Sequence, residues 1–67
     1  MDRNKLRGKI VEMYGTQEKF AEALGVMSAT VSQKLKNKRE MTRAEILKWA
    51  ELLNIPPEEI HLYFFSD

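Results

Sequence analysis

A single glycine, Gly25, separates two short helical patterns in the segment GTQEKFAEALGVMSATVSQKLKN. Glycine ends a helix in the left-handed conformation at the lowest steric cost, so residues 17–24 and 29–36 are predicted to form two helices joined by a sharp turn. The second pattern is poor in apolar residues, with Val31 and Leu35 one turn apart. These two residues suffice to dock that helix, and most of its surface is predicted to face away from the core.

Three further helices are predicted around this pair. Leu6, Ile10 and Met13 recur at helical spacing within residues 3–14. Thr42 and Glu45 form a capping box at the start of a fourth helix, and Pro57 suits the first turn of a fifth. The other residues predicted to face the core are Phe20, Ala21, Leu24, Ile46, Trp49, Ala50, Leu53, Ile55, Ile60 and Phe64. No stretch shows sustained strand alternation, so the chain is predicted to be all-α with five short helices.

Local signals also predict where these helices start and stop. Thr16 and Ser28 are predicted as N-caps, because a side-chain oxygen can accept a hydrogen bond from the free amides of the first turn. Gly15, Asn37 and Asn54 are predicted to end helices.

The composition limits the classes of function that the chain can support. At 67 residues it is predicted to be one domain, residues 1–67, with little room for a catalytic pocket beside its core. It has no cysteine and one histidine, His61, and no base is positioned beside a nucleophile, so we expect no metal, no cofactor and no enzymatic activity. No apolar run approaches the roughly 20 residues that span a bilayer, so the protein is expected in the cytoplasm and not in a membrane.

Charge is distributed unevenly along the chain. Residues 1–39 carry nine Lys or Arg and four Asp or Glu, a net charge of +5, whereas residues 40–67 carry two and six, a net charge of −4. The basic half is a candidate surface for a polyanion. The alternative is charge that is scattered only for solubility.

The spacing of Gln17, Ala21, Gly25, Val26 and Val31 resembles the helix-turn-helix of the lambda-repressor-like, Cro/CI-type family of phage and bacterial regulators. The later segment EILKWAELLNIPPEEI is similar to the fourth helix of that family and the start of its fifth, so the resemblance covers residues 3 to about 64. It implies a five-helix DNA-binding domain with the helix-turn-helix at residues 17–36.

Two positions depart from the commoner family pattern. Many members have a large apolar residue at the position of Lys34 and glycine at that of Asn37. The resulting SQKLKNK pattern resembles a phage-associated subgroup of small regulators. The departure leaves the end of the recognition helix open between Lys34 and Asn37.

The resemblance implies that the second helix of the motif enters the major groove of DNA, where its outer face reads bases. The candidate base-reading residues are Ser28, Ala29, Thr30, Ser32 and Gln33. Gln33 is the strongest of them, because its amide can donate and accept together, as the adenine edge requires; the alternative is a solvated glutamine. Ser28 is either a base contact or only a helix cap. Thr30 either meets a thymine methyl or is partly buried, and Ser32 reaches either a base or a phosphate.

The resemblance also places phosphate contacts at the start of the first motif helix and after the second. The candidate phosphate-binding residues are Thr16, Gln17, Lys36, Lys38, Arg39 and Arg43. Each cation has the alternative of a solvated surface charge.

A candidate protein interface lies in the acidic second half. It consists of Leu47, Leu52, Tyr63 and Phe65, which exceed what the helical core pattern requires. The alternative is that the segment YFF, residues 63–65, only closes the fifth helix on the core. Two functions follow. The first is a sequence-specific transcriptional regulator, Cro-like or repressor-like, of a temperate phage or prophage, which binds a double-stranded DNA operator as a homodimer. The alternative is a helix-turn-helix modulator that binds a partner repressor protein instead of DNA or as well as DNA.

Overall fold

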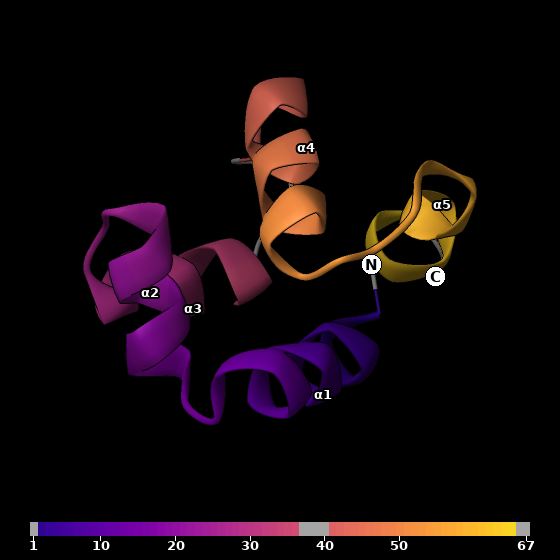
Figure 1. Cartoon of the computed structure of the whole chain (residues 1–67). Helices are drawn as coiled ribbons and strands as arrows, with labels where there is room; N and C mark the ends of the chain where they lie inside the picture. The colour runs from indigo at the N-terminus through magenta and orange to yellow at the C-terminus, as the bar shows by residue number, and fades with distance from the viewer. Residues whose placement is uncertain (1, 37–40, 66–67) are drawn as a thin grey trace.

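The computed structural model describes residues 2–36 and 41–65. Its elements are α1 (Arg3–Tyr14), α2 (Gln17–Leu24), α3 (Ser28–Lys36), α4 (Arg43–Leu52), the 3-10 helix η2 (Pro57–Glu59) and α5 (Ile60–Phe64). The described residues form helices, turns and connecting segments but no strand, which confirms the predicted all-α class. Figure 1 shows α2 and α3 side by side, with α4 and α5 following along the other side of the molecule.

Local sequence signals set several of the helix boundaries as predicted. The Thr16 hydroxyl accepts a hydrogen bond from the Lys19 amide at 3.2 Å and begins α2. Thr42 and Glu45 form the predicted capping box at the start of α4. Gly25 ends α2 in the left-handed conformation with φ +79°, and Asn54 adopts φ +56° after α4. The main-chain path of the motif is therefore encoded locally.

Two boundaries differ from the prediction. Ser28 is the first residue of α3 and not its cap, because the Met27 carbonyl accepts the hydrogen bonds from Thr30 and Val31. The chain after Pro56 first makes the 3-10 turn η2 and only then the short α5, so Pro57 begins a 3-10 helix and not the predicted α-helix. The predicted helix end at Asn37 lies outside the described residues.

The core contains nearly all of the predicted residues. Thirteen side chains in the described ranges are buried, among them Leu6, Phe20, Val31 and Leu35. Leu24, Ile46 and Ile60 are half-buried and pack against this core, as predicted.

Two side chains contradict the sequence-based assignment to core or surface. Met13 was predicted to face the core but is 37% exposed, and the neighbouring Tyr14 packs inward instead. Tyr63 was assigned to an exposed protein interface but is only 8% exposed. Its burial follows from the contact of α1 with α5: the Lys5 Nζ lies 5.0 Å from the centre of the Tyr63 ring, and the Asp2 amide donates to the Tyr63 carbonyl at 3.2 Å.

Aromatic rings connect the helices through the core. The Phe20 ring lies 5.3 Å from that of Tyr14 and 5.1 Å from that of Trp49, which in turn lies 6.4 Å from Phe64. The Tyr14 hydroxyl donates to the Leu52 carbonyl at 2.9 Å, which ties the end of α1 to the end of α4. These contacts fix the α2–α3 pair on a frame made by the other helices. No helix in the described residues has the length and apolar content to cross a membrane.

Candidate functional site

The candidate site is the outer surface of α3. Val31 and Leu35 are fully buried and hold the helix on the core, as the sequence predicted. On the rest of the helix Ala29, Thr30, Gln33 and Lys36 are exposed, while Ser28 and Ser32 are half-buried. Thr30 is exposed, and its side chain also borders a cavity between α2, α3 and α4. α3 presents a methyl group, hydroxyl groups, an amide and an ammonium group to the outside.

The first residue of α2 holds α3 by a polar contact. The Gln17 Nε2 lies 2.6 Å from the Ser32 Oγ and 3.4 Å from the Ser28 carbonyl oxygen, and donates to both. Gln17 is a predicted phosphate ligand; in the structure its side-chain amide contacts α3, and the phosphate contact stays a prediction. The half-buried Gln17 and Ser32 side chains therefore form a link between the two helices at the N-terminal half of α3.

A second link holds the C-terminal half of α3 to α4. The Lys34 Nζ lies 3.1 Å from one Glu45 carboxylate oxygen and 3.3 Å from the other. The same carboxylate accepts from the Thr42 amide at 2.9 Å within the capping box. This backbone hydrogen bond, followed by the hydrogen bond from Lys34, lowers the pKa of Glu45 below its ordinary value of 4.5.

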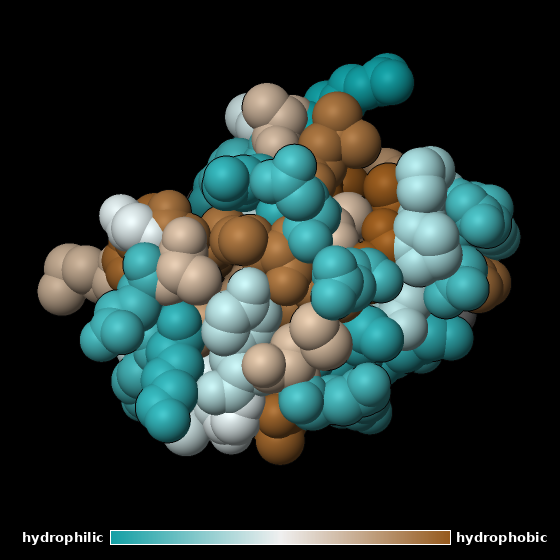
Figure 2. Space-filling view, viewed as in Figure 1, coloured by the Kyte–Doolittle hydropathy of each residue, from teal (hydrophilic) through white to brown (hydrophobic). Residues whose placement is uncertain are grey.

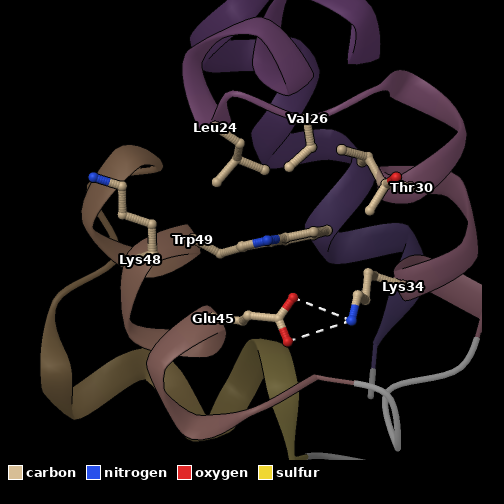
Figure 3. A pocket seen from close by; sticks show the side chains of 8 residues that line it. Leu24, Val26, Thr30, Lys34, Glu45, Lys48 and Trp49 are labelled. Atoms are coloured by element: carbon tan, nitrogen blue, oxygen red, sulfur yellow. Dashed lines mark hydrogen bonds and ion pairs between the residues drawn. The ribbon is translucent and has the colours of Figure 1, made fainter.

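Lys34 and Glu45 border a small cavity between α2, α3 and α4. It has a volume of about 150 Å³ and is mainly apolar in lining. Its lining residues are Leu24, Val26, Thr30, Val31, Lys34, Glu45, Lys48 and Trp49. In Figure 3 the Trp49 ring separates Leu24 and Val26 on one side from the Lys34–Glu45 pair on the other. Lys34 thus places its apolar stem beside the cavity and its ammonium group against the Glu45 carboxylate.

The structure describes two of the four predicted phosphate-binding cations. Lys36 ends α3 and Arg43 begins α4, and both are exposed. Lys38 and Arg39 lie outside the described residues. Thr16 is exposed but uses its hydroxyl to cap α2. Residues 2–36 and 41–65 contain no group of three or more His, Cys, Asp or Glu that could hold a metal ion.

The four residues of the candidate protein interface separate into two groups. Leu47 and Phe65 are exposed and line a groove of about 660 Å³ between α4 and the η2–α5 segment. The other residues that line this groove are Arg43, Ile46, Pro57, Ile60 and His61. Leu52 is half-buried and packs on the core, and Tyr63 is buried in it. Figure 2 shows hydrophobic surface between the positions of α4 and α5.

The family described as "Protein of unknown function (DUF739)" matches the chain over residues 1–67. The chain belongs to the DUF739 family. No curated protein matches it.

Sequence reasoning did not find the two links that orient α3 in this DUF739 chain. Gln17 and Ser32 are 15 residues apart, and Lys34 and Glu45 are 11 apart. One signal was present: a lysine at a position of the α3 pattern that is commonly apolar needs a carboxylate nearby if it is partly buried. The capping-box glutamate supplies it.

Proposed function

We propose that this protein is a sequence-specific DNA-binding regulator with a lambda-repressor-like helix-turn-helix at residues 17–36, and that it acts by occupying an operator. The observation that carries the proposal is the division of α3 into a buried edge, Val31 and Leu35, and an outer surface of exposed polar and small side chains. A helix whose polar surface is not packed against the core can enter the major groove, which is about 12 Å wide.

The chemistry of the outer surface fits base edges. Gln33 carries a donor and an acceptor on one exposed amide, which matches N6 and N7 of adenine. The Ala29 methyl group is small enough to meet a thymine methyl. Both side chains lie on the same helix as the exposed Lys36, which would bind a flanking phosphate.

The positions of exposed cations also support binding of DNA by the outer surface of α3. The exposed cations Lys36 and Arg43 lie at the end of α3 and the start of α4. Each neutralised phosphate contributes about −0.9 to the slope of log affinity against log salt. A twofold dimer would present two copies of α3 to half-sites roughly 34 Å apart, one helical turn of DNA.

Selection of bound sequences from random duplex DNA tests the proposal, because a motif with twofold symmetry would establish binding, specificity and symmetry together. Gln33→Ala is expected to remove the base preference at one position of each half-site. Lys36→Gln is expected to weaken all sites alike and to reduce the salt slope by about 1 per subunit. Lys48→Gln, which removes an exposed lysine from α4, is the matched control. DNA binding without salt dependence, unchanged by Gln33→Ala and Lys36→Gln together, would refute the proposal.

The groove between α4 and α5 favours a second candidate function, a modulator that binds a partner repressor protein. Two large apolar side chains, Leu47 and Phe65, are exposed there. Leu47→Ser is expected to release a co-expressed repressor that copurifies with the wild-type chain, and Gln33→Ala is expected to leave that complex intact. Release by Gln33→Ala instead would assign the partner to α3.

A further inference from the structure

The cavity between α2, α3 and α4 contains a hydrogen-bond donor that the protein leaves without a partner. Trp49 is only 3% exposed, and its indole nitrogen can donate a hydrogen bond but cannot accept one. No group in residues 2–36 and 41–65 accepts a hydrogen bond from this nitrogen. In the same ranges no fully enclosed side-chain nitrogen or oxygen lacks a partner. The indole nitrogen therefore keeps access to the cavity that its ring lines.

Glu45 places a hydrogen-bond acceptor beside this donor. Glu45 and Trp49 are four residues apart on α4, so their side chains are neighbours on one side of the helix. Among the described residues, Oε1 of Glu45 accepts from Thr42 and Lys34, whereas Oε2 contacts only the Lys34 Nζ, at 3.1 Å. One lone pair of Oε2 therefore remains for a further donor. In Figure 3 the indole nitrogen, in blue, lies between the Leu24 side chain and the Glu45 carboxylate.

The volume of the cavity limits what can fill it. A water molecule needs about 10–15 Å³ of such volume, whereas this cavity has about 150 Å³. Leu24, Val26 and Val31 supply apolar walls beside the Trp49 ring. A single water molecule can meet the indole nitrogen but cannot cover these walls. Cavities of about 150 Å³ with apolar walls bind benzene. The exposed Thr30 stands at the edge of the cavity, so a ligand can enter from the solvent.

We propose that this cavity binds a small phenolic compound, a single aromatic ring that carries a hydroxyl group. The hydroxyl oxygen accepts from the Trp49 indole nitrogen, and the hydroxyl hydrogen is donated to Oε2 of Glu45, so that one group satisfies both atoms. The ring packs against Leu24 and Val26. This site is separate from the outer surface of α3, and it assigns the protein a small-molecule ligand whether or not the protein binds DNA.

Titration with phenol, followed through the indole N–H resonance in nuclear magnetic resonance spectra, tests the site. Trp49 is the only tryptophan, so the 67-residue chain gives a single indole resonance. The shift of this resonance is expected to saturate, with a dissociation constant on the order of 1 mM. Phenol is expected to bind about 5-fold more tightly than benzene because of its two hydrogen bonds, although hydrophobicity alone ranks benzene first. Tighter binding of benzene would overturn the assignment of a phenolic ligand.

A matched pair of variants locates the bound phenol. Val26→Phe attaches an aromatic ring at the cavity wall and is expected to weaken phenol binding by about 10-fold or more, because the added ring occupies the cavity. Val11→Phe makes the same change at an exposed valine of α1 that does not line the cavity, and is expected to leave the affinity unchanged. Circular dichroism and thermal unfolding establish that both variants fold.

Two further results would overturn the inference. Unchanged phenol binding in folded Val26→Phe would place the ligand elsewhere on the protein. An indole resonance of the wild type that only drifts in proportion to the phenol concentration, up to the solubility limit, would mean that water alone meets the indole nitrogen.

Discussion

Removal of the Lys34–Glu45 pair tests how the C-terminal half of α3 is held against α4. The pair joins atoms 3.1 Å apart, and the two side chains are 18% and 36% exposed. Exposed ion pairs contribute about 0.2–1 kcal/mol, and the partial burial of Lys34 places this one at the upper end of that range. We therefore expect a coupling free energy of about 1 kcal/mol between the two side chains in a double-mutant cycle.

The cycle uses Lys34→Met, which keeps the apolar stem in the cavity, and Glu45→Gln, which keeps an oxygen for the Thr42 amide in the capping box. Lys34→Met removes the ammonium group with its ion pair and hydrogen bond to Glu45, and Glu45→Gln removes the charge of the carboxylate. The free energy of unfolding is measured by urea denaturation followed through the fluorescence of Trp49, the only tryptophan, which is buried beside the pair. Lys48→Met with Glu51→Gln is the control cycle, because that pair is 3.7 Å apart and more than half exposed on both sides. Its coupling is expected to be near zero.

The coupling should respond to salt and pH in a defined direction. Because folding lowers the pKa of Glu45, the stability that the pair contributes is complete above the pKa of the unfolded chain. It is lost as the pH falls through the lower pKa of the folded protein. Salt at about 1 M should reduce it, since the Debye length is then about 3 Å. A coupling below about 0.3 kcal/mol, or one unchanged by salt and acid, would refute the argument that charge attraction orients the end of α3.

Three further predictions concern the stability of the fold. Gly25→Ala should destabilise it by about 1 kcal/mol because φ is +79° at that position. Gly8→Ala lies within a helix, where the added methyl group meets nothing, and should stabilise the fold by about 0.5–1 kcal/mol. Thermal unfolding of the two variants tests this difference, and equal effects would contradict it. Tyr14→Phe should cost about 1 kcal/mol through the lost bond to the Leu52 carbonyl, with no change in the helical circular dichroism; an unchanged melting temperature would show that water replaces this bond. Met13→Gln should change the free energy of unfolding, measured by urea denaturation, by less than about 0.5 kcal/mol. A larger loss would show that the Met13 side chain contributes to the core.

The errors of the sequence-based core have a common physical origin. In α1 the spacing allows either Met13 or Tyr14 to continue the stripe of Leu6 and Ile10. The choice of Tyr14 depends on the Phe20 ring and the Leu52 carbonyl, which other helices supply. Tyr63 is buried for a similar reason, because α1 covers it. Periodicity predicts which face is apolar, but not which neighbour completes it.

The sequence by itself determined the course of the main chain through the motif. Thr16, Gly25 and the Thr42–Glu45 box act on their own backbone within a few residues, so their effects are visible without the fold. It also determined that Val31 and Leu35 dock α3, because two apolar residues one turn apart leave no other choice of buried edge.

The tertiary structure decided which polar groups on α3 remain available to a ligand. The Gln17 amide, predicted to be free for a phosphate, is directed to Ser32 and Ser28, and Lys34 is neutralised by Glu45. These pairings depend on where α2 and α4 cross α3, and a hydrogen bond tolerates only a few tenths of an ångström in that placement. Helix crossings are set by the packing of the whole core, so the donor and acceptor pattern of the α3 surface could not be predicted from any single segment.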